Sequence, residues 1–135
     1  METEPDSQVL IADADPVVSQ QILKRLHGAG IASDAVANGR SALEKLRGGR
    51  YSLVLLDMSL PQVAVEPIVE YLSAVPLSRR PVIVVLDRAY EARSLDVDLV
   101  QIVLRKPCDL TRLSEIVGSC VASAVRPDEA TLPAA

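Results

Sequence analysis

The chain of 135 residues is poor in aromatic residues: it contains three Tyr, no Phe and no Trp. It also lacks the basic surplus of most nucleic-acid-binding proteins, because its formal net charge is −4. Its two cysteines, Cys108 and Cys120, are too few for a disulfide framework and are expected to be reduced thiols. No apolar run approaches the roughly 20 residues that cross a bilayer, and the N-terminal METEPDS is too polar for a secretory signal. These absences argue against direct nucleic-acid binding and a membrane span, and they predict a cytoplasmic protein.

The chain does contain a regular alternation of short apolar runs and helical patterns. Apolar residues make up 49% and charged residues 24%, which is typical of a folded globular domain. Strands are predicted at residues 9–12, 31–36, 51–56, 81–86 and 101–104. Four of these runs are continuously apolar, which indicates strands buried on both faces of a parallel sheet, and the weaker 31–36 run is expected at an edge.

Helical patterns lie between and after these runs. They cover residues 16–28, 42–46, 67–75, 88–98 and 110–121, the fourth with a thin apolar face. Asp15 followed by Pro16 predicts the start of the first helix, and Asp109 the start of the last. The alternation predicts an α/β, flavodoxin-like, doubly wound (βα)5 fold with a five-stranded parallel sheet in the order 2-1-3-4-5. The domain is expected to span residues 8–124, with disordered ends at 1–7 and 125–135.

Charged residues lie at the carboxyl ends of three of the predicted strands. Asp13 follows the first strand, Asp57 the third and Lys106 the fifth. In a doubly wound sheet these carboxyl ends share one edge, so the three side chains are expected to converge. Two neighbouring carboxylates favour a hard cation such as Mg²⁺, and a lysine beside them favours a phosphoryl group. A carboxylate can also act as a nucleophile and become an aspartyl phosphate, which is the role predicted for Asp57.

At these residues the chain resembles the response-regulator receiver domain of bacterial two-component signalling. The resemblance rests on five motifs in matching order: VLIADADP, VANGRSALEKL, YSLVLLDMSLP, PVIVVL and RKPCDL. It implies a signalling domain rather than an enzyme, with at most autophosphorylation from small phosphodonors. It further implies that a histidine kinase or phosphotransfer protein phosphorylates Asp57 and that Lys106 pairs with the phosphate. The Mg²⁺ ligands that it implies are Asp13, Asp57 and the backbone carbonyl of Ser59.

Several positions depart from the family pattern. Ala14 stands where the family has a second metal-binding acid, and Leu86 stands where it has Thr or Ser. Asp87 replaces a small residue, and Val103 replaces an aromatic switch residue three positions before Lys106. The Gly-rich turn after the proline is replaced by PQVAVEP. Since alanine cannot supply an oxygen ligand, Mg²⁺ binding is expected to be weak or absent. This pattern is typical of an atypical receiver or pseudo-receiver.

Three functions remain open from the sequence. The first is a single-domain receiver in a phosphorelay. Its output partner or second copy docks on the face made by the predicted helix at 88–98, the strand at 101–104 and the helix at 110–121, including Leu99 and Val103. The second is a pseudo-receiver that binds a protein partner through the same face without phosphate. The third is a haloacid-dehalogenase-type phosphatase, because IADADP resembles its Asp-x-Asp opening, with Asp13 as nucleophile and Asp15 as acid/base. Asp15 is otherwise expected to cap the first helix rather than to replace the missing metal ligand.

Overall fold

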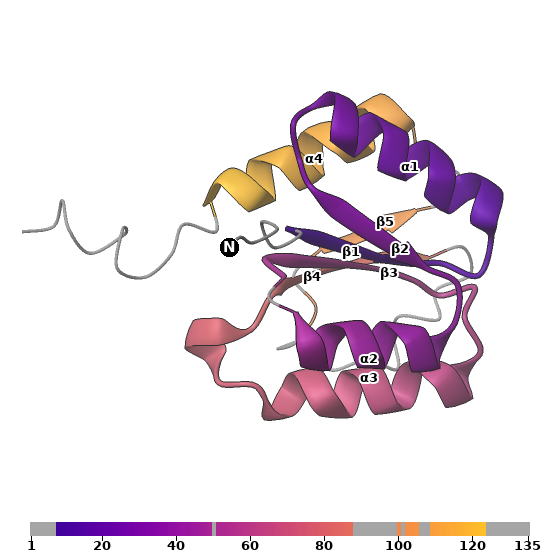
Figure 1. The fold of residues 1–135 in the computed structure, drawn as a ribbon, viewed down its shortest axis with the longest axis vertical. Coiled ribbons are helices and arrows are strands. Elements are labelled where there is room, and N and C mark those ends of the chain that lie inside the picture. The colour runs from indigo at the N-terminus through magenta and orange to yellow at the C-terminus, as the bar shows by residue number, and fades with distance from the viewer. Residues whose placement is uncertain (1–7, 50, 88–99, 101, 106–108, 124–135) are drawn as a thin grey trace, which may run out of the picture.

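Five parallel strands form the central sheet of the computed structural model, in the order β2-β1-β3-β4-β5 (Figure 1). The structure describes residues 8–49, 51–87, 100, 102–105 and 109–123. Its elements are β1 (Val9–Ala12), α1 (Pro16–Gly28), β2 (Ser33–Val36), α2 (Gly39–Gly48), β3 (Leu53–Asp57), α3 (Gln62–Ala74), the 3₁₀ turn η1 (Leu77–Arg79), β4 (Val82–Asp87), β5 (Ile102–Arg105) and α4 (Leu110–Ser123). This confirms the flavodoxin-like topology and the edge position of the second strand. The helix predicted at 88–98 and the ends at 1–7 and 125–135 lie outside the described residues.

Helices cover the sheet on both sides (Figure 1). Helices α1 and α4 lie on one face, and α2 and α3 lie on the other. Alternate residues of β1 therefore enter different clusters: Val9 and Ile11 pack toward α1 and α4, whereas Leu10 and Ala12 pack toward α2 and α3. All residues of β1 and β3 are buried, so their continuous apolar runs are explained by helices on both faces.

The third helix begins earlier than the sequence predicted. It starts at Gln62 rather than near Pro67, and the proline lies inside it. Pro67 has no backbone N–H to donate to the preceding turn, which made a later start the expected one. However, Val65 is 1% exposed and Ile68 is 0% exposed, both packed in the cluster between the sheet and α2. Burial of this apolar face in the tertiary structure therefore outweighs the lost helical hydrogen bond.

Strand β5 does not follow the prediction of burial on both faces. Ile102 and Leu104 are half-buried against the cluster beneath α1 and α4. Val103, which alternates with them, points to the other face and is 51% exposed. An apolar residue of the edge strand is thus left accessible, which a sequence pattern alone does not distinguish from a residue of a buried strand.

Candidate functional site

Two acidic side chains meet at the carboxyl ends of adjacent strands. Strands β1 and β3 pair in parallel with Ala12 opposite Leu56, so Asp13 and Asp57 come next at the same sheet edge. Each of these aspartates is only 1% exposed. Asp57 is the last residue of β3 rather than the first residue after it. The parallel register therefore places two buried carboxylates side by side.

Ser59, in the turn after β3, connects the two carboxylates. Its backbone N–H donates to Oδ1 of Asp57 at 2.7 Å, and its hydroxyl donates to Oδ1 of Asp13 at 3.3 Å. The turn is fixed further because the N–H of Met58 donates to the carbonyl of Leu86 at 2.9 Å. The sequence had assigned only a backbone role to Ser59. A serine two residues after an aspartate signals a local turn contact, but nothing local signals the bond to Asp13.

Asp15 serves the start of α1. Its carboxylate accepts hydrogen bonds from the backbone N–H groups of Val17 at 2.9 Å and Val18 at 3.5 Å, as expected for a helix cap. Its own backbone N–H donates to Oδ1 of Asp13 at 2.8 Å. Between the two acids, Ala14 is exposed and offers only a methyl group. Asp15 thus orients Asp13 through the backbone while its carboxylate is occupied at the helix terminus.

An apolar side chain lies beside Asp57 on the neighbouring strand. Asp57 pairs with Leu86 in the register of β3 and β4, so the two side chains share one face of the sheet. Leu86 is 2% exposed and packs in the cluster beneath α1 and α4. Asp87 is 3% exposed, and by alternation its side chain is directed to the opposite face, where its strand partner is Arg105. The additional acid is therefore directed away from the face that Asp57 shares with Leu86.

Some residues singled out in the sequence cannot be placed in this site. Lys106, Leu99 and Cys108 lie outside the described residues. The second cysteine, Cys120, is half-buried on α4 and packs against the cluster of that face. Burial raises the pKa of the Cys120 thiol above its ordinary value. A thiol in this environment is less reactive than an exposed one, which is consistent with a packing role.

The donor set suits a hard divalent cation in chemistry but is small. Asp13 and Asp57 supply buried carboxylate oxygens, which are the ligands that Mg²⁺ prefers. Among the described residues, no group of three or more acidic, histidine or cysteine side chains is arranged to hold a metal ion. The pair therefore fits Mg²⁺, but it offers one carboxylate fewer than a site that also has an acid at position 14.

Comparison with known proteins identifies the family. The model of the response regulator receiver domain matches residues 9–118, and the chain belongs to this family. The transcriptional regulatory protein BasR of Escherichia coli (strain K12) is 37% identical over 54 residues, which cover 40% of this chain. That match spans only 24% of BasR. The chain is thus a receiver domain of two-component signalling rather than a haloacid-dehalogenase-type phosphatase.

Solved structures of receiver domains have the same fold. A CheY-like receiver domain from Methylobacillus flagellatus has a TM-score of 0.69 at 24% identity, covering 86% of this chain and 99% of that chain. A receiver domain from Bermanella marisrubri has a TM-score of 0.74 at 21% identity, covering 87% and 99%. The receiver domain of a sensor histidine kinase from Pseudomonas aeruginosa PAO1, with magnesium coordinated in its active site cleft, has a TM-score of 0.72 at 22% identity, covering 87% and 99%.

Membership of this family has general consequences. Receiver domains are signalling domains and generally not enzymes. They interact with histidine kinases or phosphotransfer proteins, and they bind Mg²⁺ at the active site. Within the ranges that the structure describes, every helix is too short or too polar to cross a bilayer.

Proposed function

We propose that this chain is a phosphoacceptor receiver of a two-component phosphorelay, in which Asp57 takes the phosphoryl group at a weakened Mg²⁺ site. The observation that supports this most strongly is the buried pair of Asp13 and Asp57, joined through Ser59 at the carboxyl ends of β1 and β3. Burying two neighbouring carboxylates costs free energy unless a cation compensates their negative charge. Their place at the sheet's switch point is where ligands bind in this fold.

Asp57 is the nucleophile in this proposal. One carboxylate oxygen attacks the phosphorus of a phosphohistidine, the P–N bond breaks, and the departing imidazole nitrogen takes a proton from solvent. The N–H of Ser59, 2.7 Å from Oδ1 of Asp57, orients the carboxylate for the attack. Lys106 is assigned from the sequence to pair with the transferred phosphoryl group.

Asp13, Asp57 and the backbone carbonyl of Ser59 would hold the Mg²⁺ ion. When bound there, the ion supplies neutralisation of the negative charge on the phosphoryl oxygens. The carboxylate of Asp13 is kept in place by the N–H of Asp15 and the hydroxyl of Ser59. Because Ala14 supplies no oxygen, we expect weaker binding of Mg²⁺ and slower phosphorylation than in a receiver with two adjacent acids.

Intact-mass analysis after incubation with acetyl phosphate tests the proposal directly. The wild-type protein should gain one phosphoryl group in the presence of Mg²⁺ and much less in its absence. Asp57→Asn should gain none, and circular dichroism should show that this variant is folded. A folded wild-type protein that gains no phosphoryl group from acetyl phosphate or from a cognate kinase would overturn the proposal.

The second candidate is a pseudo-receiver that binds a protein without phosphate. It is favoured by Leu86, which is held in the core beside Asp57 where the family places a hydroxyl, and by Val103, which is 51% exposed on β5. In either case we place the docking surface for an output partner, or for a second copy of the chain, on β5 and the adjoining helices. We also propose that the domain spans residues 8–124 and that the protein acts in the bacterial cytoplasm. Partner binding that is unchanged in Asp57→Asn would favour the pseudo-receiver.

A further inference from the structure

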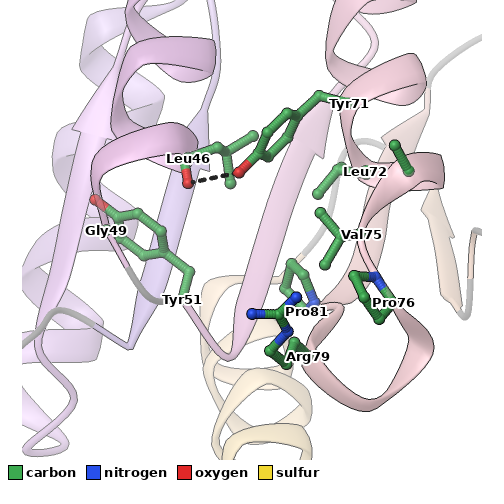
Figure 2. Close-up of a pocket in the computed structure, with 10 residues that line it drawn as sticks. Leu46, Gly49, Tyr51, Tyr71, Leu72, Val75, Pro76, Arg79 and Pro81 are labelled. Atoms are coloured by element: carbon green, nitrogen blue, oxygen red, sulfur yellow. Dashed lines mark hydrogen bonds between the residues drawn. The ribbon is translucent and has the colours of Figure 1, made fainter.

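A cleft of about 670 Å³ opens at the opposite end of the sheet from Asp13 and Asp57, and Figure 2 shows the residues that line it. Tyr51 lies just before β3 and Pro81 just before β4, so the cleft is at the amino ends of the strands. The ends of α2 and α3 and the turn η1 complete its walls. Its volume lies in the range of roughly 300–1,000 Å³ that is typical of small-molecule sites. The phosphoacceptor site does not use any of these residues.

Aromatic residues are concentrated in this cleft. Two of the three tyrosines, Tyr51 and Tyr71, line it, and both are half-buried. Among the described residues, the buried members of the sheet's two hydrophobic clusters are all aliphatic, and the tyrosines lie only at the edge of one cluster. The aromatic rings therefore contribute mainly to the surface of the cleft rather than to the interior.

Both rings are held in fixed positions. The hydroxyl of Tyr71 donates to the carbonyl of Leu46 at 3.3 Å, as Figure 2 shows, and the hydroxyl of Tyr51 donates to Oδ2 of Asp34 at 2.8 Å. At Gly49 a Cβ atom would lie 3.0 Å from Cε2 of Tyr51, so the ring rests against the backbone where the glycine allows it. The cleft is thus preorganised, which lowers the cost of binding a flat molecule against these rings.

The remaining lining gives the cleft an apolar floor and a cationic side. Leu46 and Leu72 are buried beneath it at 6% and 1% exposure, and Pro76 and Pro81 add rigid apolar walls. Figure 2 shows the guanidinium of Arg79 directed toward the side of the cleft occupied by Tyr51. Because both tyrosine hydroxyls already donate elsewhere, Arg79 is the lining side chain that is left to donate to a ligand. A guanidinium prefers a carboxylate and also stacks on aromatic faces.

We infer that this cleft is a binding site for a small aromatic carboxylate, whose ring lies against Tyr51 and Tyr71 and whose carboxylate pairs with Arg79. Another arginine, Arg47, lies over the Tyr71 ring with its guanidinium carbon 5.9 Å from the ring centre. This adds positive potential near the cleft in a chain whose net charge is −4. The chain would then respond to a small molecule at one end of the sheet and to phosphate at the other.

Titration calorimetry with naphthoate, its neutral alcohol and cyclohexanecarboxylate tests this inference. Naphthoate should bind saturably and at least about tenfold more tightly than either comparison molecule, since these lack the charge or the ring. Arg79→Gln should remove the preference for the acid over the alcohol. Arg40→Gln is the matched control, because Arg40 is an exposed arginine at the other end of α2.

Nuclear magnetic resonance locates the bound probe. Naphthoate should shift the ring signals of Tyr51 and Tyr71 and leave the methyl signals of Ile22, on the other face of the sheet, unchanged. Binding should persist in Asp57→Asn, so its outcome is independent of the phosphoacceptor proposal. Equal binding of the acid and the alcohol, an intact preference in folded Arg79→Gln, or no saturable binding to the folded wild-type chain would each overturn the inference.

Discussion

Replacing Ala14 by aspartate should convert the weakened metal site into a stronger one. Ala14 is exposed and directly follows Asp13, which is buried beside Asp57. A carboxylate at this exposed position would add an oxygen donor next to Asp13 without disturbing the core. We therefore expect Ala14→Asp to tighten Mg²⁺ binding and to accelerate phosphorylation by acetyl phosphate.

The size of the effect follows from the charges and from the exposure of Ala14. A unit negative charge about 4 Å from a divalent cation gains about 2 kcal/mol at the dielectric constant of water, which is appropriate for an exposed residue. This corresponds to roughly a thirtyfold increase in Mg²⁺ affinity. Without Mg²⁺, the same charge repels each carboxylate of the pair by about 1 kcal/mol at that distance, less at physiological salt. The substitution should thus lower stability without the metal and raise it with the metal.

Urea unfolding and Mg²⁺ titration measure both signs in the same protein. Ala14→Asn is the matched control, because it has nearly the same shape as aspartate but no charge. It should leave stability without Mg²⁺ close to that of the wild type and increase metal affinity far less. The reasoning would be refuted if Ala14→Asp and Ala14→Asn bound Mg²⁺ equally well, or if the charged variant were not destabilised in metal-free buffer.

Three further predictions concern packing, docking and ionisation. Gly39→Ala should destabilise the fold by about 1–3 kcal/mol in urea unfolding, since its methyl group would lie 2.7 Å from a side-chain carbon of α3. Gly48→Ala, which has nothing within 4 Å, should not do so. Val103→Asp should weaken capture of an output partner with little change in stability, because this side chain is 51% exposed. Burial raises the pKa of the Cys120 thiol in the folded chain. The stability that this protonated thiol contributes is therefore complete below its ordinary pKa of 9.0, and it is lost as the pH rises above that value. Alkylation of Cys120 in a Cys108→Ser background should accordingly reach its half-maximal rate at a higher pH than a free cysteine.

Each of these three predictions has a result that would contradict it. The packing argument fails if Gly39→Ala and Gly48→Ala are equally stable. The docking argument fails if Val103→Asp leaves capture of the partner unchanged while an acidic substitution on α1 abolishes it. The ionisation argument fails if Cys120 is alkylated with the pH profile of an unfolded peptide.

Much of the fold could be predicted from the sequence because burial on two faces leaves a local signature. Continuous apolar runs such as Val9–Ala12 are what a strand between two helical layers requires. Asp15 and Pro16 marked the start of α1 correctly, since a cap acts within one turn of the chain. The predicted start of α3 was wrong, because the expectation that a proline begins a helix is also local. The burial of Val65 that overrides it depends on α2 and the sheet.

The residues that the strands carry to one edge could be read from the chain alone, because parallel strands end together and Asp13 and Asp57 stand at the ends of two of them. How these residues are connected there depends on the folded structure. The bond from the hydroxyl of Ser59 to Asp13 joins residues 46 positions apart, and it depends on the register of β1 with β3 and on the shape of a turn. The cleft at Tyr51 and Arg79 likewise exists only where two helix ends and two strand starts meet. Contacts of this kind are set by packing between distant segments, and no local pattern of residue types encodes them.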